Sequence, residues 1–229
     1  MARGSRNVRL DRSLGHWPFA LTLLGFGLAG CPQDPHDVPR APTSMAQPFD
    51  STALRSALER IAGWHVIHKT QTAAPLRPGL SESQLAQALG RLPCELPREI
   101  RAVYAWHDGT ERVDAEFVWY HYFPNLEISI RNYGRRTGSG LLHPDEFPVL
   151  EFEGEYYVVR CSKLLVDASP VWLVHDNPER SVNYVSFTAY MQTAAEWYES
   201  GAAEAHDLHQ LRAIHQRHNP GAQFPYAVE

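Results

Sequence analysis

The chain has 229 residues, of which 44% are hydrophobic and 11% aromatic, enough apolar material for one domain with its own core. Asp and Glu number 26 against 21 Lys and Arg, which gives a formal net charge of −5. Because nucleic-acid binding needs cationic groups that displace counterions from phosphates, this balance argues against a nucleic-acid partner. It favours a basic protein partner, chiefly through faster encounter.

The first 30 residues have the order of a cleavable export signal. Four arginines come first, an apolar stretch runs from about Trp17 to Leu28, and small residues follow it. A single-pass helix is the alternative interpretation. Because the apolar run is shorter than the roughly 20 residues that a bilayer core needs, and Pro18 interrupts it, we expect a signal peptide over residues 1–30.

The segment Leu28-Ala29-Gly30-Cys31 resembles the lipobox of bacterial lipoprotein signals. The resemblance implies cleavage between Gly30 and Cys31 and acylation of the Cys31 thiol, palmitate included. Two or more acyl chains give stable anchoring, whereas one gives only reversible binding. Pro32 stands where some bacteria use Asp as an inner-membrane retention mark, which favours the outer membrane. We therefore expect a lipid-anchored protein of the bacterial cell envelope, facing the periplasm.

Residues 31–48 hold five prolines among small and polar residues, a composition typical of an extended, flexible tether. The remaining stretch, 49–229, has the size of a single domain. With Cys31 lipidated, Cys94 and Cys161 are left. The envelope permits a disulfide between them, but two separate, buried thiols are the favoured interpretation.

Three helices are predicted before any strand. The first begins at Asp50-Ser51, the second runs from a Ser81 cap to Gly90, and the third has Pro97 at its first helical position and ends at the Asp108-Gly109 turn. In each of them apolar residues recur every three or four positions, as on one face of a helix.

The period then changes to that of a sheet. Phe117–Phe123 is aromatic and β-branched and predicts a strand, while Pro124–Arg136 returns to helical spacing. Phe147–Phe152 and Tyr156–Cys161 predict two strands joined by a tight turn at Glu153-Gly154, the strongest local signal of the chain.

Two further strands are predicted over Val171–Val174 and Asn183–Phe187, and then two helices: one capped by Thr188 and ending at Gly201, and one over about Glu204–Gln216. Consecutive strands with short connections favour an antiparallel sheet. The predicted fold class is therefore α+β, with a sheet of about four to six strands and helices packed mainly on one face.

Several short motifs, in this order and spacing, resemble the SUKH superfamily, which includes fungal cell-wall assembly regulators and bacterial immunity proteins. The opening motifs are Leu89-Gly90, Leu92-Pro93, Leu96-Pro97, Ile100, Tyr104 and Asp108-Gly109. The later motifs are Phe147-Pro148-Val149, Glu153-Gly154, Ser169-Pro170-Val171 and Ser186-Phe187-Thr188, followed by Met191 and Trp197. The resemblance covers residues 76–201, and the helix over 50–68 lies outside it.

This resemblance implies a protein-binding module that is not an enzyme and needs no cofactor or small-molecule substrate. An immunity-type protein that neutralises a toxin by covering it is the favoured hypothesis, and an envelope adaptor in cell-wall assembly is the alternative. A metal-dependent enzyme is a third hypothesis. The sequence contains no Gly-rich phosphate loop, no G-x-S-x-G elbow and no H-E-x-x-H pair.

Acidic and aromatic residues around the predicted strands are the candidate partner-binding residues. Strand alternation predicts that Trp119 and His121 point one way and Tyr120 and Tyr122 the other, and that several hairpin carboxylates share a face. Ordinary solubilising charge is the alternative interpretation. The candidates are Glu111, Asp114, Glu116, Tyr120, Tyr122, Glu151, Glu153 and Glu155.

Four histidines crowd the last predicted helix. Three-residue steps place His206 beside His209, and His215 beside His218, so each pair is a weak candidate for metal binding. Because two ligands do not make a site, we expect a solvated polar helix and no resident metal.

Overall fold

A computed structural model describes residues 49–68, 75–175 and 180–226, all of which belong to one unit of the chain, Val38–Glu229. The predicted leader, the Gly30–Cys31 cleavage site and the Pro-rich tether lie outside these residues. The helices are α1 Ser51–His68, α2 Glu82–Leu89, α3 Arg98–Trp106, α4 Leu126–Gly138, α5 Phe187–Glu199, α6 Ala202–Ala205 and α7 Leu208–His218. In this part of the chain, no helix is long and apolar enough to cross a bilayer.

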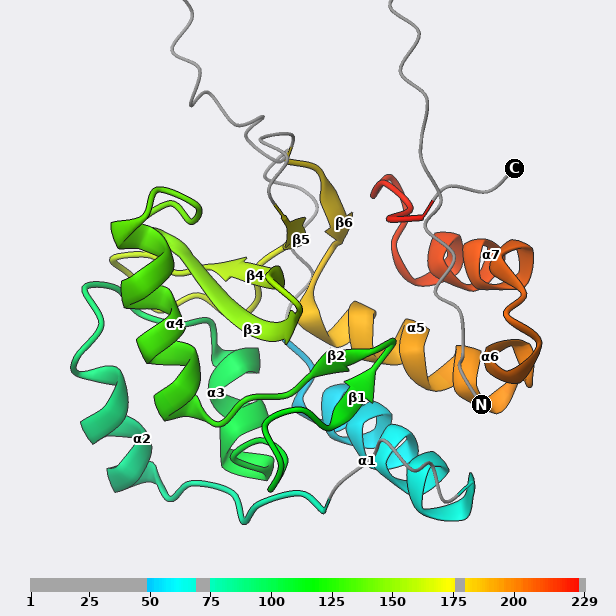
Figure 1. The fold of residues 1–229 in the computed structure, drawn as a ribbon, viewed down its shortest axis with the longest axis horizontal. Coiled ribbons are helices and arrows are strands. Elements are labelled where there is room, and N and C mark those ends of the chain that lie inside the picture. Colours follow the sequence, from blue (N-terminus) through cyan, green and yellow to red (C-terminus); the bar gives the residue numbers. More distant parts are fainter. Residues whose placement is uncertain (1–48, 69–74, 176–179, 227–229) are drawn as a thin grey trace, which may run out of the picture. The chain divides into compact units, whose positions relative to one another are not determined.

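The strands form one antiparallel sheet in which each strand pairs with the next along the chain, in the order β1-β2-β3-β4-β5-β6 (Figure 1). They are β1 Glu116–Val118, β2 His121–Tyr122, β3 Glu146–Phe152, β4 Glu155–Arg160, β5 Val171–Val174 and β6 Val182–Tyr184. The predicted α+β class is confirmed, as is the hairpin with its turn at Glu153-Gly154.

Alternation along β4 and β5 divides the sheet into two apolar faces. Tyr157, Val159 and Val171 face the main core, which they share with α1, α3 and α5. Alternate residues, among them Tyr156 and Trp172, form a smaller cluster on the second face, beneath the loop that follows α4. The helices therefore pack mainly on one face, as predicted.

Local sequence explains where the predicted helices begin. Ser81 and Gln84 form a reciprocal capping box at α2, and the Asn125 side chain accepts a hydrogen bond from the Ile128 N–H at α4. The Asp108 carboxylate accepts a second bond at the start of α4, from the N–H of Leu126 at 2.8 Å. Pro97 is the N-cap of α3 and not its first helical residue, so this helix begins one residue later than predicted.

Two predictions around the last strands are corrected. The cap of α5 is Ser186, whose hydroxyl accepts from the Ala189 N–H at 3.0 Å, and not Thr188, which lies in the first turn. The predicted last helix is interrupted: α6 ends at Ala205, its C-cap His206 has φ +50°, and Asp207 caps α7. The adjacent C-cap and N-cap residues produce this break.

The predicted continuous strand over Phe117–Phe123 is also wrong. The chain forms a hairpin instead, β1 and β2, closed by a two-residue turn at Trp119-Tyr120. Both turn residues have positive φ, +48° and +68°. Sequence patterns could not locate this turn, because it contains none of the Gly, Asn or Asp residues that such turns favour.

Cys94 and Cys161 form a disulfide, so the prediction of two separate thiols is wrong. The loop before α3 runs antiparallel to the segment after β4, where Glu95 and Ser162 exchange two backbone hydrogen bonds of 2.8 and 3.1 Å. This pairing brings the two Cα atoms to 5.5 Å, a normal disulfide spacing. The sequence separation of 67 residues gave no signal of it.

Glu99, the second residue of α3, is completely buried. Its carboxylate accepts hydrogen bonds from the N–H groups of Ser169 at 3.0 Å, Phe187 at 3.1 Å and Thr188 at 2.9 Å, and from the Thr188 hydroxyl at 3.0 Å. Burial raises the pKa of Glu99, while these bonds act in the opposite direction. One side chain thus joins α3, the loop before β5 and the first turn of α5.

We predict that Glu99→Ala lowers the free energy of unfolding by about 3–5 kcal/mol, because it leaves several buried N–H groups without an acceptor. Glu59→Ala is the control, since Glu59 forms an exposed i,i+4 pair with Arg55 and should change stability by less than about 1 kcal/mol. Urea denaturation followed by circular dichroism measures both. Equal small effects of the two substitutions would contradict the role given to Glu99.

Candidate functional site

Two hairpin turns lie at the same end of the sheet. The β1–β2 hairpin closes at Trp119-Tyr120 and the β3–β4 hairpin at Glu153-Gly154. Because Tyr122 pairs with Glu151 in antiparallel register, the start of β2 lies beside the end of β3. We call this part of the molecule, comprising the two turns and Phe152, the hairpin end.

The Trp119-Tyr120 turn is strained. Two-residue hairpin turns with positive φ favour Asn-Gly or similar pairs, and the second hairpin follows this rule in part, with Gly154 at φ +97°. Trp119 and Tyr120 both carry large side chains in the left-handed region, which costs about 1–2 kcal/mol for each residue. Such conformations persist where surrounding contacts impose them, and they cluster at functional sites.

Contacts of Trp119 impose this conformation. Its buried ring packs against Tyr190 and Trp197, with centroid distances of 5.1 and 5.6 Å. Its N–H donates to the Tyr198 hydroxyl at 3.1 Å, and its carbonyl accepts from Nδ1 of His121 at 2.8 Å. Since α5 supplies all three of the other aromatic residues, the core fixes Trp119 and leaves Tyr120 outside.

Tyr120 is the exposed aromatic residue of the hairpin end, with 57% of its surface accessible. Its ring centroid lies 6.1 Å from that of half-buried Phe152, which also contacts Tyr122 at 5.8 Å. The structure therefore brings predicted candidates Tyr120 and Tyr122 together around Phe152, a contact that sequence reasoning missed. An aromatic ring held outward on a rigid turn can anchor a protein partner.

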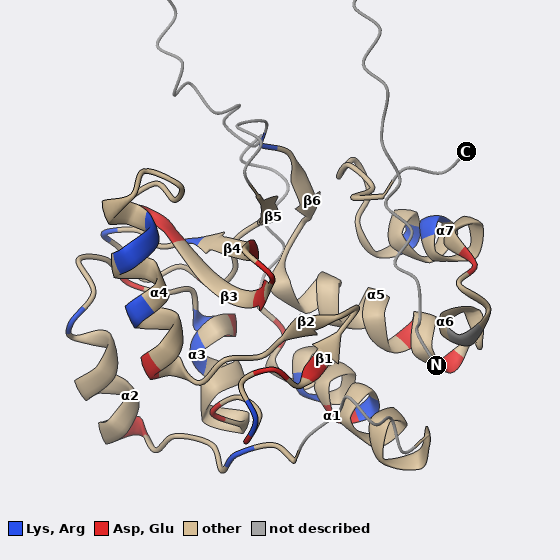
Figure 2. Ribbon diagram, viewed as in Figure 1, with Lys and Arg blue, Asp and Glu red and all other residues tan. Residues whose placement is uncertain are grey.

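A polar row crosses the second face of the sheet next to this aromatic group. Register places Glu116, Tyr122, Glu151 and Tyr156 side by side on that face. Oε2 of Glu151 accepts from Nδ2 of Asn132 on α4 at 2.5 Å. Burial raises the pKa of Glu151, against the effect of the arginines on α4. Figure 2 shows blue positions along α4 and red positions on β1 and β3.

The predicted carboxylates do not form a single surface. Glu151 pairs with Tyr156 and Glu155 with Phe152, so strand alternation places these two carboxylates on opposite faces, contrary to the prediction. Glu153 is exposed in the turn between them. The prediction failed because a two-residue turn does not preserve the alternation of the strand before it.

Glu111 and Asp114 lie away from the hairpin end, in the exposed loop that leads into β1. The Glu111 N–H donates to the carbonyl of Pro75 at 2.8 Å. Asp114 accepts from Nε of Arg112 at 3.2 Å, and this bond lowers the pKa of Asp114. The structure thus separates these two residues from Tyr120 by the length of β1.

The four C-terminal histidines are not gathered at one point. Buried His215 donates from Nε2 to the carbonyl of Asn183 at 2.6 Å, and Nε2 of His218 lies 2.7 Å from the Glu196 carboxylate. His206 lies outside α7, and His209 is exposed on it. Within residues 49–68, 75–175 and 180–226, no group of three or more His, Cys, Asp or Glu is placed to hold a metal ion.

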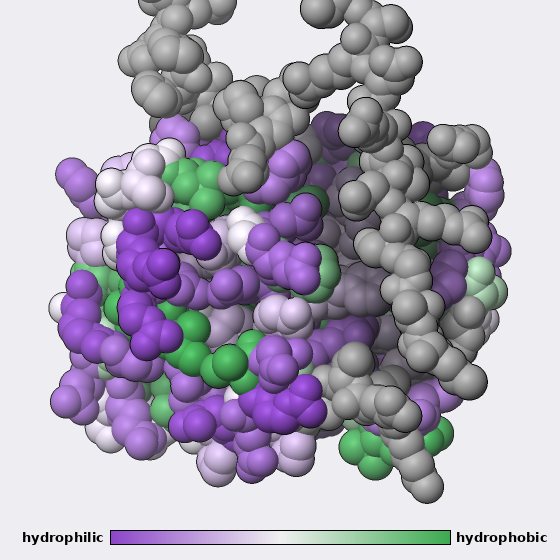
Figure 3. Space-filling model, viewed as in Figure 1, coloured by the Kyte–Doolittle hydropathy of each residue, from purple (hydrophilic) through white to green (hydrophobic). Residues whose placement is uncertain are grey.

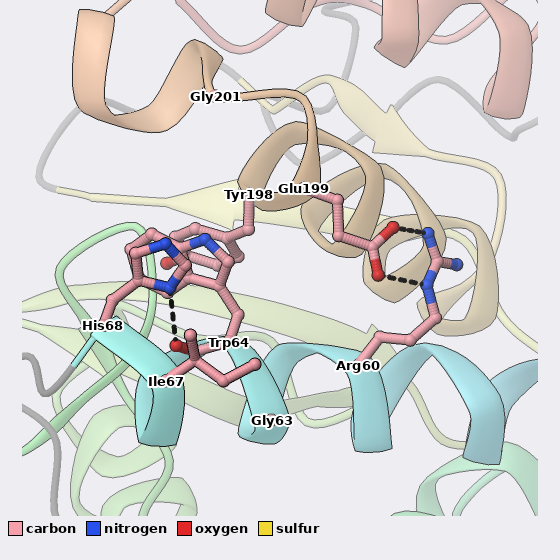
Figure 4. A pocket seen from close by; sticks show the side chains of 8 residues that line it. All are labelled: Arg60, Gly63, Trp64, Ile67, His68, Tyr198, Glu199 and Gly201. Carbon is pink, nitrogen blue, oxygen red and sulfur yellow. Dashed lines mark hydrogen bonds and ion pairs between the residues drawn. The ribbon is translucent and has the colours of Figure 1, made fainter.

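A pocket of about 480 Å³ lies beside the C-terminal ends of α1 and α5 (Figure 4). Trp64 is stacked between His68 and Tyr198, with centroid distances of 4.2 and 4.4 Å, so both of its faces are covered. Arg60 and Glu199 form a bidentate ion pair with each other.

Several residues of the SUKH-like motifs have clear structural roles. Asp108 caps α4, and Gly109 adopts φ +78°, where an added Cβ would meet the Asn125 nitrogen at 2.5 Å. Only glycine fits such a position. No protein-family model matches the chain, and a search of curated proteins finds no similar sequence. The resemblance therefore stays a prediction.

We predict that stability falls as the pH drops from about 6.5 to 4. Burial lowers the pKa of His121 from 6.5 to about 4, so the unfolded chain binds a proton in this range that the folded chain does not, an effect of about 3 kcal/mol. His121→Asn should flatten the slope of unfolding free energy against pH, measured by urea denaturation. His209→Asn is the control for removing a histidine, and an unchanged slope in His121→Asn would contradict this account.

We predict that Tyr120→Asn keeps the free energy of unfolding within about 1 kcal/mol of the wild type. Asn tolerates the left-handed region, so the relief of strain offsets the lost contact with Phe152. Tyr157→Ala, a buried counterpart, should cost about 3–5 kcal/mol. Thermal unfolding compares the two, and a large loss in Tyr120→Asn would show that Tyr120 serves packing instead.

Proposed function

We propose that the chain is a lipid-anchored, protein-binding module of the bacterial envelope that neutralises a basic toxin by occlusion. The observation that carries the proposal is the strained Trp119-Tyr120 turn, which holds an aromatic side chain in solvent. Asn or glycine in the turn would avoid this strain. A large outward residue at a strained position is best explained by contact with a partner.

The surroundings of Tyr120 suit a basic partner. Glu153 is exposed in the neighbouring turn, and the row on the second face adds Glu116 and Glu151. Carboxylates around an aromatic anchor accelerate encounter with a cationic surface and disfavour acidic partners. Stable complexes bury about 1,200–2,000 Å² of surface in total, so the partner would extend from Tyr120 over the polar row.

The Cys94–Cys161 disulfide supports a location outside the cytosol. Structural disulfides persist in oxidising compartments, which include the bacterial periplasm, and are rare where glutathione and thioredoxin keep thiols reduced. The same compartment follows from the predicted leader and lipobox. The disulfide is an independent support, because it lies in the folded domain and not in the leader.

Occlusion requires a rigid surface. The hairpin end is held by Trp119 packed on α5 and by the paired strands β2 and β3. Its binding to a partner therefore costs little conformational entropy. The SUKH resemblance adds an immunity-type role to this geometry. An envelope adaptor would use the same surface, and the two roles differ in whether binding protects a cell from a toxin.

We predict that the gene protects cells against a toxin encoded beside it, and that Tyr120→Asn and Glu153→Lys each weaken binding to this toxin at least about tenfold. Glu82→Lys on exposed α2 is the matched control for charge. Survival assays and calorimetry with the purified toxin measure both effects. If Tyr120→Asn and Glu153→Lys bind the toxin as tightly as the wild type and the Glu82→Lys control do, the assignment of the surface is overturned. If deletion of the gene changes cell shape but not toxin sensitivity, the adaptor role is favoured.

We predict further that radiolabelled palmitate enters the wild-type chain and that Cys31→Ala abolishes both labelling and recovery in the membrane fraction, because stable anchoring needs the acyl chains. Tyr120→Asn is the control and should be labelled as the wild type is. Identical fractionation of wild type and Cys31→Ala would overturn the anchor while leaving the binding surface to be judged by the toxin assay.

A further inference from the structure

Three consecutive apolar residues are exposed in the segment between β4 and β5. Leu164, Leu165 and Val166 have 78%, 37% and 36% of their surface accessible. We call them the apolar loop. On the face in view in Figure 3, apolar patches are small and separated by hydrophilic surface. Single exposed apolar residues are ordinary, but a run of three on one loop marks a contact surface.

The apolar loop is fixed in place at both ends. Before it, Cys161 is bonded to Cys94, and the Ser162 hydroxyl donates to the carbonyl of Leu164. At its last residue, the carbonyl of Val166 accepts from the Arg98 N–H at 2.9 Å. Since its backbone is fixed, the exposure of its side chains is a property of the fold and not of a loose segment.

We infer that the apolar loop inserts into the interface of the membrane that holds the acyl anchor. The inference rests on the proposed function, because it needs the anchor at Cys31. It deepens that proposal by giving the domain a defined orientation toward the bilayer.

The composition of the loop favours a lipid surface over a second protein. The apolar loop offers only Leu and Val side chains, which are under-represented among the residues that anchor protein interfaces, whereas the Tyr of the hairpin end is enriched there. Shallow insertion of a few apolar side chains is enough for a domain that the anchor already holds nearby. The tether over 31–48 reaches at most about 60 Å when extended, so the domain stays close to the bilayer.

The charges at the two ends of the loop fit the same occupant. Lys163 is exposed directly before Leu164, and a lysine beside inserted apolar residues can reach anionic headgroups with its ammonium. Asp167 follows the loop, and its carboxylate lies 3.2 Å from Nε of Arg98, which offsets its repulsion from such headgroups.

The location of the loop agrees with the proposed function of the hairpin end. β4 starts at the Glu153-Gly154 turn and ends at Arg160, just before the apolar loop, so the two surfaces lie at opposite ends of this strand. A domain that rests on the bilayer through the apolar loop therefore points Tyr120 and Glu153 away from it. The partner would then approach without competition from lipid.

Site-specific fluorescence in the full-length, acylated protein tests the inference. An environment-sensitive fluorophore is placed at Leu164→Cys or, as the matched control, at Glu153→Cys, in vesicles of phosphatidylethanolamine and phosphatidylglycerol that carry a nitroxide lipid. Cys94 and Cys161 are in the disulfide and do not react. We expect at least about twofold stronger quenching at position 164 than at 153, because an inserted loop reaches the acyl boundary. Adding Leu165→Asp should reduce quenching at 164 to the control level.

Each other outcome has a defined meaning. Equal or absent quenching at both positions in a protein that carries palmitate overturns the apolar-loop inference and leaves the anchor in place. Shielding of position 164 that depends on protein concentration and not on lipid shows that a second copy covers the loop, which also overturns it. A chain without palmitate that stays in the soluble fraction overturns the proposed anchor, and the insertion with it.

Discussion

The buried carboxylate of Glu99 is the constraint on which the remaining geometry depends. It accepts hydrogen bonds from the loop before β5 and from the first turn of α5, so α3, the sheet and α5 have one fixed arrangement. α5 then supplies the rings that hold Trp119, and Trp119 determines the position of Tyr120. A buried carboxylate without hydrogen-bond donors is strongly disfavoured, so burial of Glu99 requires the N–H groups of these two segments around it. A single acidic residue in the interior thus controls a surface at the far end of α5.

The domain combines two kinds of exposed surface with opposite chemistry. The hairpin end offers an aromatic ring with carboxylates, which suits a soluble, cationic protein, whereas the apolar loop offers aliphatic side chains with a lysine, which suits lipid. The two surfaces lie at opposite ends of β4. The same strand that joins them also contributes Tyr157 and Val159 to the core, so the spacing between the two surfaces is rigid.

Local signals predicted much of this fold. Ser81, Asn125 and the Glu153-Gly154 pair act within a few residues of themselves, so the helices and the hairpin they start or close could be located from the sequence. The Trp119-Tyr120 turn could not, because distant α5 imposes it on residues that disfavour it. The disulfide and the role of Glu99 were missed for the same reason, since their partners lie 67 and up to 89 residues away. The sequence did not indicate that Tyr120 and Tyr122 lie beside the Glu153-Gly154 turn, because the strand pairing of Tyr122 with Glu151 joins residues 29 positions apart. It also did not separate Glu111 and Asp114 from these residues.

The strands pair in chain order, whereas helix α1 packs against α5, far along the chain. The two kinds of contact therefore form at different stages of folding. Each strand finds its neighbour a short distance along the chain, so the sheet can form early from local contacts. α1 is different, because its partner is α5, and their ion pair joins Arg60 to Glu199 across 139 residues. The apolar stripe of α1 therefore stays exposed until α5 packs against it. The core is completed only when these two distant helices meet, whatever the sheet has formed before.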